Sequence, residues 1–280
     1  MSITEKKINN VVIEPLHTSN YKMNRVMGKN YFDLFPYLLF ISAKKKSGKT
    51  SLIYNIIKNT TNKKTKFFIF CSTYNVDKSW IKILEFLQKR GNIVEKFGSI
   101  KEDKHTDNLD IIIDALTRAD EESENEEEEE GGGVCINFQP MPVPVKRKKK
   151  KRKKKKKKSE KIVPEYLFLF DDISNQLKSP SISRLLKIHR HMGNGCNIII
   201  SSQYVKDLVP MAVSQIDYKI VFKNMSEERL RHIHKVLDLS IDFEDYLKLY
   251  HYATREPYQF LYTNTRSEEM RKGFNTRLII

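Results

Sequence analysis

The sequence has few cysteines, glycines and prolines, and it has no long apolar run. Its three cysteines, Cys71, Cys135 and Cys196, form no closely spaced pair, so we predict neither a zinc site nor a disulfide framework and expect a reducing compartment. Ten glycines and nine prolines exclude collagen-like chains. No apolar run approaches the roughly 20 residues that cross a bilayer, and the first ten residues lack the apolar stretch of a signal peptide. We therefore expect a soluble intracellular protein with no membrane partner.

The composition is that of a globular, basic protein. Hydrophobic residues make up 39% of the 280, with 13 Tyr and 15 Phe, which is far too many for a wholly disordered chain. The formal net charge is +16, of which residues 146–158 contribute 13 positive charges and residues 120–130 nine negative ones. Without these two runs a charge of +12 remains. This charge favours a polyanionic partner, a nucleic acid or a nucleotide.

Apolar runs of strand length recur along the chain, with helical patterns between them. A continuously apolar run is typical of a strand that is covered on both faces. Strands that alternate with helices predict an α/β fold with a mostly parallel, doubly wound sheet. The predicted strands are 37–41, 67–71, 166–170, 197–200, 218–222 and 258–263. The clearest helices are 49–60, one that ends near Gly91, 107–118 and one that begins at Ser179 and Pro180.

One segment between a predicted strand and a predicted helix has the pattern of a phosphate-binding loop. It reads AKKKSGKT and matches G-x-x-x-x-G-K-[ST] except at the first position, where Ala43 replaces glycine. In such a loop, backbone N–H groups enclose the phosphates, the lysine reaches the β- and γ-phosphates, and the hydroxyl binds magnesium. Lys49 and Thr50 take those roles, which makes ATP and Mg²⁺ the predicted cofactors. The predicted nucleotide-binding residues are Ala43, Lys44, Lys45, Lys46, Ser47, Gly48, Lys49, Thr50 and Ser51.

The alternative to a P-loop is an ordinary basic turn. Ala43 bears on this choice, because alanine adopts a positive φ less readily than glycine. If the segment is a P-loop, Lys49 is an exposed phosphate contact, and its replacement by alanine should abolish ATP turnover and leave the fold intact.

A predicted strand ends in two carboxylates, as in a Walker B element. The sequence LFLFDD places Asp171 and Asp172 directly after the apolar run. Asp171 would hold the magnesium ion through water, and Asp172 would act as the general base on the attacking water. The alternative is a loop that merely begins with two aspartates, one of which caps the next helix.

A polar residue ends the next predicted strand. Gln203 follows Ile198–Ile200 and two serines. The order of P-loop, acid-ending strand, helix and strand with a terminal polar residue is that of the additional-strand ATPases. In that topology Gln203 is a sensor that contacts the γ-phosphate or the attacking water. Outside it, Gln203 would be a solvent-facing strand end.

These segments together resemble the FtsK/HerA superfamily, and most closely the genome-packaging ATPases of large double-stranded DNA viruses and virophages. The resemblance spans about residues 35–225 and rests on AKKKSGKT, LFLFDD, RLLKIHRHMGNGCNIIISSQ and IDYKIVFK. It implies a RecA-like core, a ring oligomer such as a hexamer, and ATP-driven translocation of double-stranded DNA into a capsid. The sequence departs from the family pattern at Ala43 and at Asp172, where many members have glutamate.

The resemblance also implies a catalytic arginine that acts on the neighbouring subunit. The family places it shortly before the sensor strand, where this sequence has Arg190. Arg184, earlier on the same helix, is the rival candidate. The alternative for either residue is a solvated helix face. His189 and His191 are interpreted as packing and surface residues, because no metal-ligand partner lies at a suitable spacing.

These features define the predicted domains. They are an N-terminal extension (1–34), a P-loop ATPase domain (35–268) interrupted by a disordered acidic and basic insertion (119–162), and a C-terminal tail (269–280). The basic run of the insertion would bind DNA, direct nuclear import or serve as a solvated linker.

The leading functional hypothesis is an ATP-hydrolysing motor that packages double-stranded DNA, with capsid proteins as further partners. It would work in the host cytoplasm, in a viral factory or in the virion. A scaffold that binds ATP without sustained hydrolysis is the alternative. A nucleotide or nucleoside kinase is a third hypothesis, which the paired aspartates and Gln203 disfavour.

Overall fold

A computed structural model describes residues 21–103, 106–131 and 160–279. Most of the predicted N-terminal extension, Cys135 and the basic run lie outside the described residues. The strands are β1 (Leu38–Ser42), β2 (Lys66–Cys71), β3 (Val94–Phe97), β4 (Tyr166–Asp171), β5 (Cys196–Ser202), β6 (Tyr218–Phe222), β7 (Phe260–Asn264), β8 (Met270–Lys272) and β9 (Thr276–Leu278). The α-helices are α1 (Lys49–Thr60), α2 (Lys78–Arg90), α3 (Asn108–Gly131), α4 (Pro180–Ile188), α5 (Pro210–Val213), α6 (Glu227–Val236) and α7 (Phe243–Ala253). Short 3-10 helices are η1 (Met23–Arg25), η2 (Ser174–Gln176), η3 (His189–His191) and η4 (Val205–Asp207).

The described strands form one sheet in the order β3-β2-β4-β5-β1-β6-β7-β8-β9. In this order, the first six strands, β3 through β6, are parallel to one another. The strands β7, β8 and β9 continue the sheet in antiparallel pairs. The predicted mostly parallel sheet is thus confirmed. The strand β5, which Gln203 follows, lies between β1, which leads into the predicted P-loop, and β4, which ends at the two aspartates. This is the additional-strand arrangement of a RecA-like P-loop fold.

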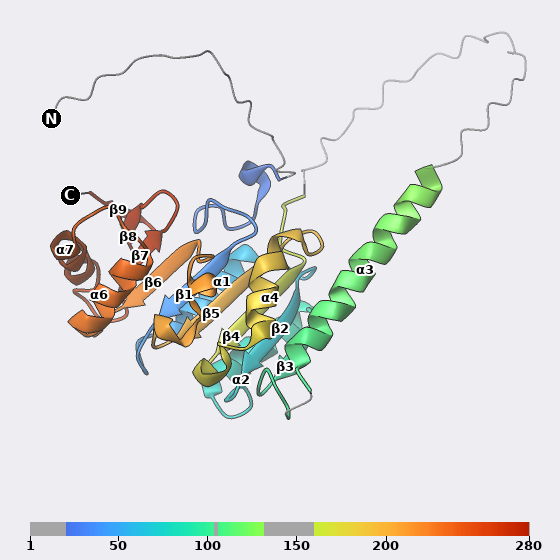
Figure 1. Cartoon of the computed structure of the whole chain (residues 1–280), viewed down its shortest axis with the longest axis horizontal. Coiled ribbons are helices and arrows are strands. Elements are labelled where there is room, and N and C mark those ends of the chain that lie inside the picture. The colour runs from blue at the N-terminus through green and yellow to red at the C-terminus, as the bar shows by residue number, and fades with distance from the viewer. Residues whose placement is uncertain (1–20, 104–105, 132–159, 280) are drawn as a thin grey trace, which may run out of the picture.

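The sheet is central because helices cover both of its faces (Figure 1). Residues of α1 and α2 pack with Leu39 and Ile41 on one face, and residues of α3 to α7 pack with Leu38 and Phe40 on the other. Every residue of β1, β4, β5 and β6 is therefore buried, which explains why these strands are apolar without alternation.

Aromatic side chains strengthen the pairing of β2 with β4. The rings of Phe68 and Phe168 stack with centroids 4.7 Å apart, and those of Phe70 and Phe170 with centroids 5.0 Å apart. Both are register pairs of these two parallel strands. Each such stack contributes about 0.5–1.5 kcal/mol beyond the area it buries. The strand that carries the two aspartates is thereby held firmly in the sheet.

Three boundaries differ from the sequence-based expectation. Helix α3 continues to Gly131, past the predicted start of the insertion at 119, because its glutamates are good helix formers. The segment predicted as a C-terminal tail forms β8 and β9, since Met270 is buried against the sheet. The last predicted strand, 258–263, instead begins at Phe260, which leaves Tyr258 in a turn.

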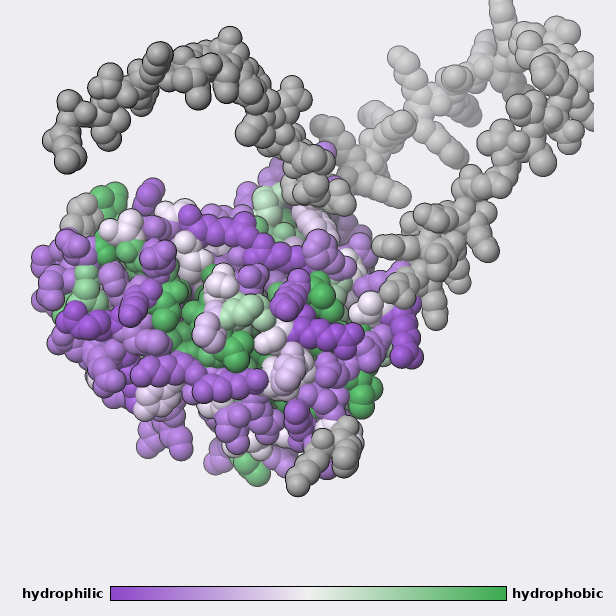
Figure 2. Space-filling model, in the orientation of Figure 1, coloured by the Kyte–Doolittle hydropathy of each residue, from purple (hydrophilic) through white to green (hydrophobic). Residues whose placement is uncertain are grey.

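The face of the molecule that carries α4 is mostly hydrophilic. Figure 2 shows hydrophilic side chains over most of this face, with apolar side chains gathered in its central part. Within the described ranges, no helix has the length and apolar character to cross a membrane.

A lysine interrupts the apolar run of β6. Lys219 of β6 is fully buried, and its ammonium nitrogen lies 3.6 Å from the centroid of the Phe40 ring. Among the described residues it has no hydrogen-bond partner. Burial holds the pKa of Lys219 well below its usual range, because the charged form loses its hydration. Burial of the lysine therefore opposes folding at neutral pH, because the folded chain binds the proton of Lys219 less tightly than the unfolded chain does.

Replacing Lys219 with methionine should stabilise the protein by about 1–3 kcal/mol, because methionine fills the same space without an unsatisfied polar group. Urea unfolding at pH 7 measures this change. The gain should shrink as the pH rises toward the usual pKa of lysine, where the unfolded chain also loses the proton. Lys235→Met, at an exposed position of α6, is the control and should change stability by less than about 0.5 kcal/mol. A Lys219→Met protein less stable than wild type would contradict the prediction.

Candidate nucleotide-binding site

The predicted P-loop connects the end of β1 to the start of α1, as a phosphate-binding loop must. Its turn is made by Lys46 and Gly48, whose φ angles are 64° and 94°. Ala43 is not among the residues with positive φ, so alanine at the first position causes no left-handed strain in the loop. Helix α1 begins directly after Gly48 and directs its first N–H groups and the positive end of its dipole toward the loop.

The loop contains a polar atom that suits a phosphate. The hydroxyl of Ser47 is buried and has no hydrogen-bond partner among the described residues. A buried hydroxyl without a partner is costly, and a phosphate oxygen would accept its hydrogen bond. The loop is therefore fitted to the group that its sequence pattern predicts.

The two predicted aspartates lie at the end of β4, facing the P-loop lysine. The ammonium nitrogen of Lys49 lies 2.5 Å from Asp171 Oδ1 and 3.0 Å from Asp172 Oδ1. The Asp171 side chain is 1% exposed and that of Asp172 is 51% exposed. Burial lowers the pKa of Lys49, but the two carboxylates outweigh it and raise the pKa above its ordinary value. Lys49 is therefore charged at neutral pH.

A residue that the sequence analysis did not assign to the site also holds Asp171. The indole Nε1 of Trp80, on α2, donates a hydrogen bond of 2.9 Å to Asp171 Oδ2. Trp80 is fully buried and shares the apolar face of its helix with Ile83 and Leu87. Helical spacing alone predicts a core residue, and only the position of α2 beside β4 shows that its polar edge reaches the carboxylate.

The carboxyl ends of β1, β4 and β5 open onto a common cavity. It has a volume of about 600 Å³ and is lined by the P-loop, Asp172 and Gln203, among others. The register explains this convergence, because Ser42 pairs with Ser202, one residue before Gln203. The structure thus brings together the predicted phosphate-binding loop, general base and sensor.

The residues present also suit a magnesium ion held together with phosphates. Asp171 Oδ1 is buried, has no hydrogen-bond partner among the described residues, and meets Lys49 as an ion pair. Carboxylate and hydroxyl oxygens are the ligands Mg²⁺ prefers, and it commonly takes one or two carboxylates plus substrate phosphates. No group of three or more His, Cys, Asp or Glu side chains in the described ranges could hold a metal by itself. Asp171 and Thr50 therefore fit a magnesium ion that arrives with a nucleotide.

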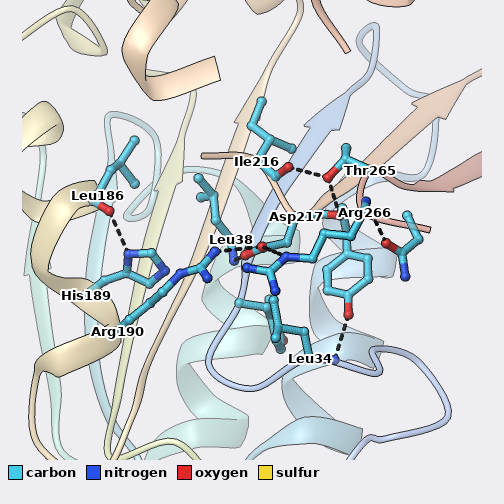
Figure 3. Close-up of polar contacts among 12 residues, drawn as sticks. Leu34, Leu38, Leu186, His189, Arg190, Ile216, Asp217, Thr265 and Arg266 are labelled. Carbon is cyan, nitrogen blue, oxygen red and sulfur yellow. Dashed lines mark hydrogen bonds and ion pairs between the residues drawn. The ribbon is translucent and has the colours of Figure 1, made fainter. Parts of the chain in front are cut away.

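The two candidate arginines are not brought to this cavity. Arg190, in η3, lies 2.7 Å from Asp217 Oδ1, and Arg266 Nε lies 3.3 Å from the same oxygen (Figure 3). The backbone N–H of Leu38 donates to Asp217 Oδ2. Asp217 precedes β6 and Leu38 begins β1, so this cluster lies at the opposite end of the sheet from the P-loop, roughly 13 Å along the strand.

Arg184 and His189, which precede Arg190 in the sequence, also have partners within the chain. Arg184 of α4 forms ion pairs with Asp110 and Asp114 of α3, at 3.4 and 2.6 Å. His189 is buried, with Nδ1 2.8 Å from the carbonyl oxygen of Leu186 (Figure 3), which confirms its interpretation as a packing residue. Burial lowers the pKa of His189 to about 4. The action of Arg190 or Arg184 on a neighbouring subunit stays a prediction.

Comparison with known proteins gives matches to solved structures at low sequence identity. No protein-family model and no curated protein matches the chain. Among solved structures, the genome-packaging NTPase B204 from Sulfolobus turreted icosahedral virus 2, in complex with ATP-gammaS, is 19% identical with a TM-score of 0.48, over 85% of this chain and 97% of B204. The cytoplasmic domain of the Thermomonospora curvata type VII secretion ATPase EccC is 14% identical with a TM-score of 0.44, over 87% of this chain and 25% of EccC.

A third match is the pCW3 conjugation coupling protein TcpA, which is 13% identical with a TM-score of 0.43, over 84% of this chain and 58% of TcpA. The strand order of the sheet identifies the architecture without these comparisons. The chain therefore has the RecA-like, additional-strand P-loop fold that its sequence predicts.

Proposed function

We propose that the protein is an ATP-hydrolysing motor that translocates double-stranded DNA and packages a viral genome. The observation that carries the proposal is the convergence of Lys49, Asp172 and Gln203 on one cavity, with the buried Asp171 paired to Lys49, where the carboxyl ends of β1, β4 and β5 meet. An ordinary basic turn does not account for a lysine that pairs with two carboxylates, one of them buried, beside a polar strand end.

In the proposed reaction, the first N–H groups of α1 and the Lys49 ammonium bind the β- and γ-phosphates and stabilise the charge that develops on the transferring group. Asp172, which is half exposed at the cavity, orients the attacking water and accepts its proton. Gln203 hydrogen-bonds the γ-phosphate or that water. Thr50 and Asp171 would hold a magnesium ion that arrives with ATP, and this ion would supply positive charge against the phosphates.

The proposed partners follow from charge and from the resemblance. A charge of +12 outside the two charged runs supports binding of a polyanion, which we take to be double-stranded DNA. B204 is described as a genome-packaging NTPase, and TcpA as a conjugation coupling protein. We propose by analogy a ring oligomer, with a hexamer as one option, which works with capsid proteins in the host cytoplasm, a viral factory or the virion. Nuclear import through the basic run stays open.

Purified protein should release phosphate from ATP several-fold faster when duplex DNA is present, because a translocating motor couples hydrolysis to movement along its track. A colorimetric phosphate assay at fixed low salt, with duplex, single-stranded or no DNA, measures this effect. Lys49→Ala protein is the control for contaminating ATPases. ATP binding with no turnover under any condition would favour the scaffold, and phosphate transfer to a nucleoside or nucleotide would favour the kinase.

A further inference from the structure

An exposed tyrosine lies directly on the P-loop. Tyr258 is in the turn between α7 and β7, and its side chain is 71% exposed, more than that of any other large aromatic residue of the described chain. A Cβ atom built on Gly48 would lie only 3.1 Å from Tyr258 Cδ1. The tyrosine ring therefore packs against the backbone of the phosphate-binding loop, and a side chain at position 48 would displace it.

The backbone at Tyr258 is unusual for a tyrosine. Its φ angle is 64°, in the left-handed region that favours glycine and that aromatic residues rarely adopt. A residue held in this region costs conformational energy, and such residues gather at ligand sites. Packing in the core does not explain why a tyrosine occupies this position, because most of its side chain is exposed. The position and the backbone together point to a ligand that uses the ring.

Beside the ring is a cavity whose lining is uncharged. It has a volume of about 460 Å³ and is lined by Gly48, Ser51, Leu52, Asn55, Phe222, Tyr258 and Phe260. Three of these side chains are aromatic, and Asn55 supplies a carboxamide whose Nδ2 donates to the Ser51 carbonyl oxygen. The cavity that holds the rest of the P-loop contains lysines and Asp172, and it also reaches Tyr258. A phosphate suits the charged cavity, whereas a flat aromatic group with a polar edge suits the uncharged one.

We propose that the uncharged cavity is the subsite for the nucleobase and that Tyr258 is the platform on which the base stacks. This inference rests on the proposed binding of ATP at the P-loop. A triphosphate at the N-terminus of α1 leaves the base within reach of Tyr258, because Gly48 lines both cavities. The Asn55 carboxamide, on the second turn of α1, is placed at the edge of the base.

The proposal is tested by titration calorimetry of MgATP and of magnesium tripolyphosphate, which has the same run of phosphates and no base. The main variant is Tyr258→Gly, because glycine accepts a φ of 64° and the fold should be retained or stabilised. Loss of stacking should raise the Kd for MgATP about tenfold or more and leave the Kd for tripolyphosphate unchanged. Tyr258→Phe keeps the ring and should bind MgATP within about twofold of wild type.

Tyr252→Ala is the matched control, since Tyr252 is an exposed tyrosine of α7 outside both cavities. Its Kd for either ligand should equal that of wild type. Equal effects of Tyr258→Gly on both ligands, or no effect on either, would overturn the nucleobase subsite while leaving ATP binding at the P-loop in place. If wild-type protein bound neither ligand, the proposed function itself would be overturned, and the subsite with it.

Discussion

Asp172→Asn protein should bind ATP with nearly wild-type affinity and hydrolyse it at about one hundredth of the wild-type rate or less. The amide cannot accept a proton from the attacking water, and a positioned general base typically contributes a factor of about 10²–10⁴. The variant should fold normally, because Asp172 has a φ of 54° and asparagine tolerates this left-handed region well. Single-turnover phosphate release with radiolabelled ATP, together with equilibrium ATP binding, separates the chemical step from binding.

Asp172→Glu is the informative companion of this variant. Glutamate, which many FtsK/HerA members have at this place, keeps the carboxylate. Part of the activity should therefore be retained. The glutamate side chain is longer, and a moderate loss of rate is expected from altered positioning of the water. Wild-type rates in Asp172→Asn protein would remove the assignment of Asp172 as the general base.

Lys49→Ala protein should lose ATP turnover by about a hundredfold or more, since a preorganised cation on the transferring phosphoryl group is removed. The structure corrects the sequence-based expectation that Lys49 is exposed and that its replacement leaves the fold intact. Lys49 is only 15% exposed and is the ion-pair partner of Asp171, which is buried. Without the lysine this carboxylate remains buried and uncompensated, which costs up to about 3–5 kcal/mol of stability.

The two effects of Lys49→Ala can be separated by a second substitution. Asp171→Asn in the Lys49→Ala background removes the buried charge, so the double variant should regain most of the lost stability and remain inactive. Thermal unfolding and phosphate release on the same samples measure both quantities. Turnover that recovers together with stability would mean that the single variant was inactive only because it was unfolded.

The central strands could be predicted from the sequence because a strand that is buried on both faces appears as a continuous apolar run. The runs at 37–41 and 166–170 are apolar at every position and 197–200 is apolar except at Asn197, and the structure places β1, β4 and β5 there within one or two residues. The strand β3 could not be predicted, because its residues Val94–Phe97 are only partly buried and include two charged side chains. A sheet edge of this kind carries no strong periodicity.

The site residues that directly follow a strand could be predicted from the sequence. The residues that reach the site only through tertiary contacts could not. Asp171 and Asp172 stand directly after an apolar run, so their place at the carboxyl edge follows from the strand itself. Trp80 reaches Asp171 from α2, and Tyr258 reaches the P-loop from the turn before β7, each from a distant part of the sequence. Apolar and aromatic residues at such positions look the same whether they face a core or a ligand.

The position of β5 between β1 and β4 has a consequence for local opening of the chain. A strand paired on both sides can detach only if it breaks two ladders of hydrogen bonds, so the middle of this sheet should open least often and exchange its amide hydrogens most slowly. Gln203 is attached to β5 and Asp171 ends β4, whereas Tyr258 belongs to a surface turn. Fluctuations that loosen the turn would therefore release the base side of a bound nucleotide while the phosphate side keeps its protein ligands in place.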